Sequence, residues 1–135
     1  MDSEKDILAS ANATLGRINY QAIVNSGGHT LIADEPADLG GADTGMAPYN
    51  LLLSGLASCT VITLRMYIER KMWIVDEINI SLEMFKNKEG VQIDAKITFK
   101  GELTNEQRER LLTIADACPV HKMLVGNVVI NNALQ

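Results

Sequence analysis

The stretch PYNLLLSGLASCTVITL, residues 48–64, decides the fold, because it carries no charged side chain. Pro48 suits the first turn of a helix, and the charges that follow lie between residues 65 and 71, where cations favour the helix dipole. A membrane span needs about 20 mostly apolar residues. This run is shorter and contains Asn, Ser and Thr side chains. The sequence therefore predicts a buried helix over residues 48–71 and no membrane association.

This helix is apolar on nearly every face over its first four turns. Its large apolar side chains are Leu51, Leu52, Leu53, Leu56, Val61, Ile62 and Leu64. Such a helix must be buried on all sides, whereas one antiparallel sheet of this size covers one side. Gly55, Ala57 and Ser58 are small enough for another helix to approach closely. We therefore predict that a second copy of the chain supplies the missing cover in an obligate homodimer.

Strand patterns flank the helix on both sides. Residues 18–24 and 29–33 are typical of strands, and Asn25-Ser26-Gly27-Gly28 between them has strong turn chemistry. Residues 78–85 and 91–99 alternate apolar and polar side chains, and the turn at 87–90 joins them as a hairpin. Each of these two strands has one polar face that is expected to be exposed to solvent, which indicates an antiparallel sheet.

The remaining segments complete the order of elements. Residues 1–13 are predicted to be a loose or helical tail. A second helix starts at Thr104, which forms a capping-box pattern with Gln107. Pro119 stops that helix or restarts it as a turn that ends near Gly126, and residues 127–133 resemble a last strand. The order predicts a single α+β domain over residues 1–135.

Composition excludes several classes of protein. The net charge is −5 and no run of Lys or Arg occurs, which disfavours nucleic acid and anionic membranes as partners. The N-terminus starts acidic and lacks an apolar signal core, so we expect a cytoplasmic protein. Two cysteines are present, and in that compartment they should be reduced at rest. A disulfide between them would then be catalytic or transient.

Each cysteine has a functional and a structural interpretation. Cys59 is either a small apolar residue in a core helix or a nucleophile reached through the notch at Gly55. If Pro119 opens a new turn, Cys118 lies at the N-cap of that turn, where free N–H groups stabilise a thiolate. The alternative is a small residue that closes a helix end. His121 could pair with this thiol or cap the short turn.

A zinc site would have to use Cys59, Cys118, His29 and His121. Structural zinc sites usually show paired ligands at close spacing, and only Cys118-x-x-His121 approaches that pattern. We therefore expect no metal site, and His29 is expected at a turn edge.

Two segments together resemble the OsmC/Ohr family, the osmotically induced and organic hydroperoxide resistance proteins, and are most similar to its OsmC-like branch. The segments are GGHTLIADEPADLGGADTGMAPYNLLLSGLASCTVITLRMYIERK, residues 27–71, and ACPVHKML, residues 117–124. The resemblance implies an intertwined homodimer with two central helices wrapped by antiparallel sheets. It also implies a thiol peroxidase without a cofactor. Cys59 would attack an organic hydroperoxide, Cys118 would resolve the sulfenic acid as a disulfide, and a dithiol reductant would open it.

The family also uses an arginine on an early strand, held by a glutamate just upstream of the first cysteine. Arg17 is the only arginine before Cys59 and is the candidate, with a solvated strand end as the alternative. Residues 48–50 are Pro-Tyr-Asn, so the family's glutamate is missing. Asn50 can hydrogen-bond a guanidinium but carries no charge. The candidates to replace the glutamate are Glu35, Asp38 and Asp43, and the predicted substrate-binding residues are Tyr49, Asn50, Leu52 and Gly55.

Three hypotheses follow for the function. The first is a dimeric thiol peroxidase that prefers apolar hydroperoxides. The second is a redox-sensing or ligand-binding protein of the same fold with weak or no peroxidase activity, which the missing glutamate motivates. The third is a structural dimer with inert core cysteines.

Overall fold

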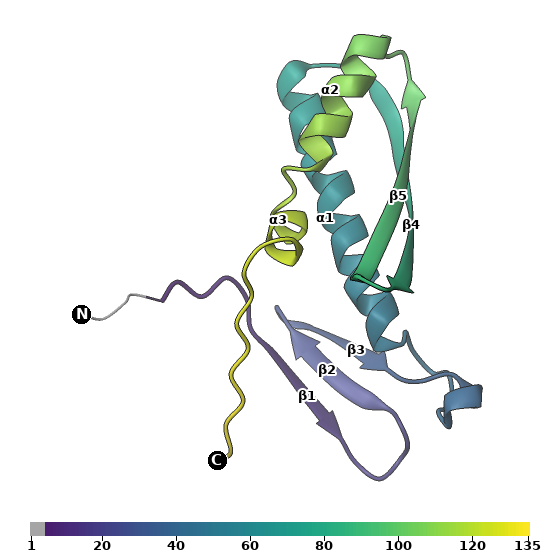
Figure 1. Cartoon of the computed structure of the whole chain (residues 1–135), viewed down its shortest axis with the longest axis vertical. Helices are drawn as coiled ribbons and strands as arrows, with labels where there is room; N and C mark the ends of the chain where they lie inside the picture. The colour runs from purple at the N-terminus through teal and green to yellow at the C-terminus, as the bar shows by residue number, and fades with distance from the viewer. Residues whose placement is uncertain (1–4) are drawn as a thin grey trace. The chain divides into compact units, whose positions relative to one another are not determined.

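The computed structural model describes residues 5–135, and the chain forms two compact units, residues 1–52 and 53–135 (Figure 1). The first unit contains three strands and a short 3₁₀ helix. The second contains a hairpin and two helices, and the helix α1 begins in one unit and ends in the other. The elements are β1 (Ala11–Leu15), β2 (Ala22–Ser26), β3 (His29–Ala33), η1 (Ala37–Leu39), α1 (Pro48–Lys71), β4 (Val75–Asn87), β5 (Gly90–Gly101), α2 (Asn105–Ala115) and α3 (Pro119–Leu124).

The N-terminal unit is built on an antiparallel sheet with the order β1-β2-β3. The strand at 29–33 and its turn are confirmed, and Gly27 and Gly28 supply the positive φ angles of that turn. The tail was predicted over residues 1–13, of which residues 1–4 lie outside the described part of the chain. The prediction is wrong at its other end, because β1 starts at Ala11 and pairs with β2. The strand predicted over 18–24 begins only at Ala22, since residues 18–21 form a turn in which the Gln21 N–H donates to the Ile18 carbonyl.

The loop after β3 is organised by the buried side chain of Asp34. Its carboxylate accepts hydrogen bonds from the N–H of Tyr20 at 3.1 Å, the N–H of Glu35 at 2.7 Å, and both the N–H and hydroxyl of Thr44 at 3.0 and 2.5 Å. A Cβ on Gly45 would lie 1.9 Å from the carbonyl oxygen of Ile32. The loop therefore depends on one carboxylate and on a position that admits only glycine.

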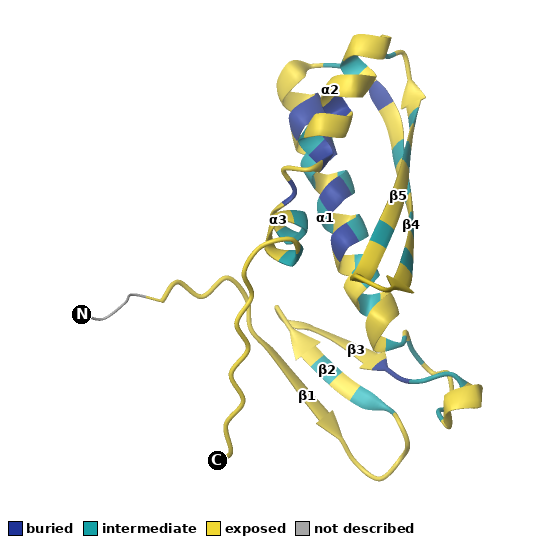
Figure 2. Cartoon of the chain, in the orientation of Figure 1, coloured by how far each residue is buried: buried dark blue, intermediate teal, exposed yellow. Residues whose placement is uncertain are grey.

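The helix predicted over residues 48–71 is confirmed as α1. Its buried residues repeat every three to four positions and form one stripe: Leu56, Thr60, Leu64, Tyr67 and Ile68. Figure 2 colours other parts of α1 as exposed. The exposed apolar residues of this helix include Leu52 at 42%, Ile62 at 52% and Met66 at 59%. By length and composition α1 could cross a bilayer, with a mean hydropathy of 1.6, a property that core helices of soluble proteins share.

The C-terminal unit packs helices on a long hairpin. β4 and β5 pair antiparallel as the alternating pattern predicted, with Ile80 opposite Ile97. The capping box at the start of α2 is confirmed, because the Thr104 hydroxyl accepts from the Gln107 N–H and the Gln107 side chain accepts from the Thr104 N–H. The strand predicted over residues 127–133 is wrong, because this segment pairs with no strand of the described chain, and its apolar side chains are exposed.

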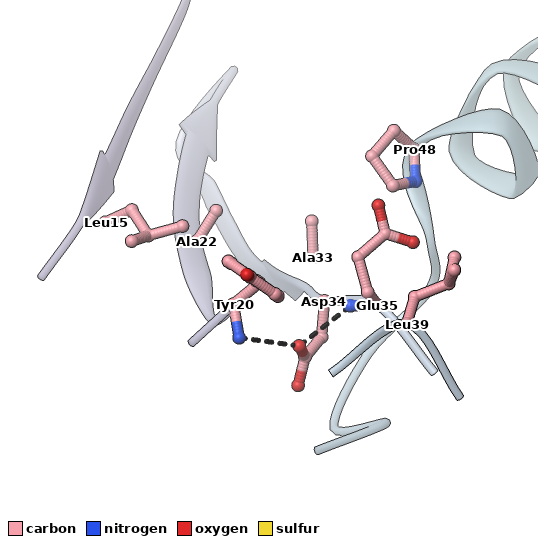
Figure 3. Close-up of a pocket in the computed structure, with 8 residues that line it drawn as sticks. All are labelled: Leu15, Tyr20, Ala22, Ala33, Asp34, Glu35, Leu39 and Pro48. Carbon is pink, nitrogen blue, oxygen red and sulfur yellow. Dashed lines mark hydrogen bonds between the residues drawn. The ribbon is translucent and has the colours of Figure 1, made fainter. Parts of the chain in front are cut away.

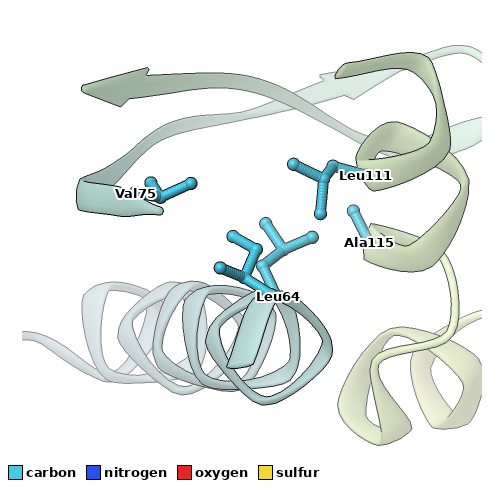
Figure 4. Close-up of a cluster of buried hydrophobic side chains, with 5 residues drawn as sticks. Leu64, Val75, Leu111 and Ala115 are labelled. Carbon is cyan, nitrogen blue, oxygen red and sulfur yellow. The ribbon is translucent and has the colours of Figure 1, made fainter. Parts of the chain in front are cut away.

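The core of this unit lies where α1, α2 and the start of β4 meet (Figure 4). Its buried members are Leu64, Ile68, Val75, Leu111 and Ala115, and the residues packed against them include Trp73, Ile78 and Phe99. A second contact joins the two long helices, because Arg110 Nε donates to the Tyr67 hydroxyl at 3.0 Å. The expected α+β fold with antiparallel sheets is therefore confirmed. The single domain over residues 1–135 stays a prediction.

Candidate thiol site

Cys118 occupies the N-cap of α3, as Pro119 predicted. Its φ and ψ are −57° and 127°, outside the helical region, and Pro119 takes the first helical turn. The side chain is completely buried. The Lys122 N–H donates to the Cys118 carbonyl at 3.0 Å, which closes the first turn of α3. The sulfur is therefore fixed by local backbone chemistry on a segment that packs within the C-terminal unit.

Cys59 lies on α1 and is partly exposed, and it interacts directly with Cys118. Both thiols are free, so no disulfide joins them in this structure. The structure brings together the two sulfurs that the sequence singled out, from elements far apart along the chain. The partly exposed thiol is the one a reactant reaches first, and the buried thiol lies behind it.

Two hydroxyls of α1 accompany the thiols. Thr60 is buried, with 4% of its surface exposed, and its hydroxyl donates to the Leu56 carbonyl at 2.9 Å. The same hydroxyl interacts with Cys118, while Thr63 interacts with Cys59. Thr60 was not among the predicted site residues. Its position directly after Cys59 in the uncharged helix was the signal that the sequence offered.

The surroundings of Cys118 favour its thiolate. Burial is the largest single influence on the pKa of this thiol and raises it, but the other contacts outweigh it. They come from the Cys59 thiol, the His121 N–H, the Thr60 hydroxyl and the Val120 N–H, so the pKa of Cys118 is lowered from its ordinary value.

The surroundings of Cys59 favour its protonated form. Burial raises the pKa of this thiol most, and the neighbouring Cys118 raises it further. The Val120 N–H and the Thr63 hydroxyl act in the opposite direction without outweighing these influences. Two thiols in contact resist carrying two charges. Of the two thiols, Cys118 is therefore the one that ionises more readily, and Cys59 is the one that keeps its proton to higher pH.

The predicted substrate-binding residues lie along the first turns of α1. A Cβ added to Gly55 would meet no atom within 4 Å, so the notch one turn before Cys59 is open in this chain. Leu52 is partly exposed one turn further back, and Tyr49 is 74% exposed. Asn50 makes an interaction within the described chain. Their roles toward a substrate stay predictions.

Arg17 lies in the turn between β1 and β2 and is exposed. In residues 5–135 it forms no ion pair with Glu35, Asp38 or Asp43, the carboxylates considered as replacements for the missing glutamate; the ion pair found there joins Lys100 and Glu77. Arg17 belongs to the N-terminal unit, and its part in the thiol site stays a prediction.

The histidines lie at two different kinds of position. His29 is exposed at the start of β3, as a turn-edge residue would be, and His121 lies in α3. Across the described part of the chain, no group of three or more His, Cys, Asp or Glu side chains is arranged to hold a metal ion.

Comparison with known proteins identifies a matching family and several solved structures of similar fold. Residues 40–132 match the family described as OsmC-like protein. The fold is similar to an OsmC-like protein of Mycoplasma pneumoniae, with a TM-score of 0.76, 20% identity and 90% of each chain covered. Comparison with curated sequences gives no match.

Two further solved structures carry names that mention hydroperoxides. One is an organic hydroperoxide resistance protein OsmC of Legionella pneumophila, with a TM-score of 0.63, 20% identity, and 92% of this chain and 93% of that one covered. The other is the organic hydroperoxide resistance protein OhrB of Bacillus subtilis, with a TM-score of 0.61, 25% identity, and 90% and 93% covered.

Proposed function

Because the chain belongs to the OsmC-like protein family, we propose that it is a thiol peroxidase that reduces organic hydroperoxides. The observation that carries this proposal is the direct contact between a partly exposed thiol, Cys59, and a buried thiol, Cys118. A peroxidase of this kind needs one sulfur that meets the peroxide and a second that traps the product before further oxidation.

The proposed reaction balances with the two sulfurs alone. The Cys59 thiolate attacks the outer oxygen of the hydroperoxide, the O–O bond breaks, and the alkoxide leaves as an alcohol after gaining a proton. Cys59 is then a sulfenic acid. The Cys118 thiolate attacks that sulfur, an S–S bond forms, and hydroxide leaves and is protonated to water. A dithiol reductant returns both sulfurs to the reduced state and carries the two electrons of the cycle.

Cys118 also handles the proton in this proposal. Cys118 ionises more readily than Cys59, so we propose that the Cys118 thiolate forms first and that the nucleophile forms when it accepts the Cys59 proton. The same proton then goes to the departing alkoxide, which restores the Cys118 thiolate for the resolving step. General acid–base help of this kind typically contributes 10² to 10⁴-fold in rate, as an order of magnitude.

The surroundings of Cys59 favour apolar substrates. Gly55 leaves open space one turn away, and Leu52 and Ile62 on the same face of α1 are apolar and exposed. We propose that these residues, with Tyr49 and Asn50, contact the organic part of the hydroperoxide, and that Arg17 supplies the cation. The apolar contacts favour organic hydroperoxides over hydrogen peroxide.

We further propose that the working form is a cytoplasmic homodimer. Within one chain α1 buries a single stripe, and Ile62 and Met66 remain more than half exposed. The sheet of the N-terminal unit likewise leaves Ile23, Leu31 and Ile32 exposed. Apolar surface of this extent is typical of protein–protein contacts, and a second copy supplies it in the simplest way.

A redox sensor or ligand-binding protein is the second candidate. The missing carboxylate at residues 49 and 50 favours it, because a guanidinium near the thiols would lack the ionic partner that orients it. In that case the two thiols would oxidise slowly, and turnover with a dithiol would be negligible.

The test is a thiol count. Reduced protein is mixed with cumene hydroperoxide, and free thiols are measured over minutes. We expect two thiols to disappear per peroxide in the wild type, and a sulfenic acid without a disulfide in Cys118→Ser. Slow loss of thiols, no faster than in free cysteine, would rule out the peroxidase and leave the second candidate.

A further inference from the structure

The N-terminal unit contains a cavity of about 530 Å³, drawn in Figure 3. Its volume falls in the range of about 300–1,000 Å³ that is typical of small-molecule sites. Most of its wall is apolar, and the residues that line it are Leu15, Tyr20, Ala22, Ala33, Asp34, Glu35, Leu39 and Pro48. All of them belong to the N-terminal unit, so the cavity is complete within one compact unit.

Two carboxylates adjoin this apolar wall, and they differ in their partners. Asp34 accepts four hydrogen bonds, from Tyr20, Glu35 and Thr44, and these hold its pKa far below its usual range, the Thr44 hydroxyl most strongly. Burial of Asp34 acts in the opposite direction and is outweighed. The carboxylate of Asp34 therefore holds the loop in place. Both of its oxygens already accept hydrogen bonds within the protein, so it is a poor binding group for a ligand.

Glu35 is in the opposite situation. Its backbone is engaged, since its N–H donates to Asp34 and its carbonyl accepts from the Asp43 N–H at 3.1 Å. Its carboxylate, however, has no donor and no cation partner within residues 5–135. In Figure 3 the side chain extends away from Asp34 toward Pro48 and Leu39. A half-buried carboxylate beside an apolar wall loses hydration without gaining a compensating contact.

From this arrangement we propose that the cavity binds a small organic cation, a primary ammonium group carried on an apolar body. The ammonium has three donors and no acceptor, so it suits the two free oxygens of Glu35. The apolar body would lie against Leu15 and Leu39. Neither sulfur lines the cavity, so this proposal does not depend on the chemistry of the two thiols.

The structure also indicates why the charged group should be small. Gly41 and Gly45 leave no space for a Cβ, so the loop that carries Glu35 is tightly folded, which disfavours a bulky headgroup. Asp34 fixes the same loop from its other side. A primary ammonium is the most compact cation with several donors, and it leaves the rest of the cavity to the alkyl or aryl part.

The experiment is an NMR titration of the full chain with n-hexylammonium, and with n-hexanol and hexanoate as probes of the same length. We expect saturable shifts at the amides of residues 33–41 with the ammonium, weaker shifts with the alcohol, and the weakest with the carboxylate. Glu35→Gln should weaken ammonium binding about tenfold or more, as expected for a charge-assisted hydrogen bond.

Asp38→Asn is the matched control. It removes one negative charge from the same loop, but Asp38 is exposed and does not line the cavity. Affinity in this variant should equal that of the wild type. Equal binding of the alcohol, equal loss in both variants, or no saturation up to about 10 mM ammonium would each overturn the proposal. The spectrum of each free variant shows directly whether it has kept its fold.

Discussion

Cys118 and Cys59 interact directly, with Cys118 fully buried and Cys59 partly exposed. The contacts around the pair lower the pKa of the buried thiol and raise the pKa of its neighbour. This order of ionisation leads to measurements that do not depend on peroxide turnover.

The first prediction concerns which cysteine carries the charge. In Cys118→Ser, thiolate absorbance at neutral pH should fall toward that of free cysteine, whose pKa is about 8.5. Cys59→Ser should keep its thiolate, because the serine hydroxyl can still donate to Cys118. Titration of ultraviolet thiolate absorbance in both variants measures this, with the double serine variant as the blank. Retention of a neutral-pH thiolate in Cys118→Ser would place the charge on Cys59 instead.

The second prediction concerns Thr60. Replacing it with valine keeps the shape of the side chain but removes the hydroxyl beside Cys118, so the pKa of Cys118 should rise and the thiolate fraction at neutral pH should fall. Thr113→Val is the matched control, because its hydroxyl makes the same kind of bond within a helix, to the Glu109 carbonyl at 3.4 Å, at an exposed site. An identical titration for both variants would show that Thr60 only packs.

The third prediction concerns the second copy of the chain. Ile62→Glu places a charge on the exposed apolar face of α1 and should convert a dimer into monomers, as seen by sedimentation velocity. Leu112→Glu is the control, because Leu112 is an equally apolar residue, 64% exposed, on α2 and not on α1. A wild-type chain that sediments as a monomer would contradict the dimer outright.

The fourth prediction concerns acid stability. The pKa of Asp34 is lowered from 3.8, so its contribution to stability is fully present above that pH and is lost as the pH falls through the lowered value. The thermal unfolding temperature of the wild type should therefore fall progressively below about pH 4. Asp34→Asn should be less stable at neutral pH and should depend less on acid, whereas Asp38→Asn should behave as the wild type. Amide shifts of Tyr20 and Thr44 would locate the change in the loop.

The fifth prediction concerns the core of the C-terminal unit. Leu111 is completely buried between α1 and β4, so Leu111→Ala should lower the free energy of unfolding by about 2–5 kcal/mol. The adjacent Leu112 is mostly exposed, and Leu112→Ala should change it by less than about 0.5 kcal/mol. Urea unfolding measures both values, and equal effects would show that the core is placed wrongly.

The elements that the sequence predicted correctly are those with strong local rules. Pro48 and the uncharged run after it give the start and the burial of α1, and Thr104 with Gln107 gives the start of α2. The position of Cys118 followed from the restriction that Pro119 places on its predecessor. Each of these rules acts within a few residues, so one sequence suffices to apply them.

What the sequence did not reveal depends on partners distant along the chain. Residues 11–13 lack a strong strand pattern. They form part of β1 because their backbone pairs with that of β2. Residues 127–133 have a strand pattern, but no strand of the described chain accepts them. The hydrogen bonds from Tyr20 and Thr44 to Asp34, and the contact of Thr60 with Cys118, likewise arise only in three dimensions.

The burial of Cys118 behind Cys59 has a consequence for damage by excess oxidant. An electrophile that diffuses in from solution encounters the sulfur of Cys59 first. The modified Cys59 is then already in contact with a second nucleophile, the sulfur of Cys118. The inner sulfur is shielded from direct attack by its burial. Under the proposed function, the depth of each sulfur below the surface would set the order of the two oxidation events without a moving lid.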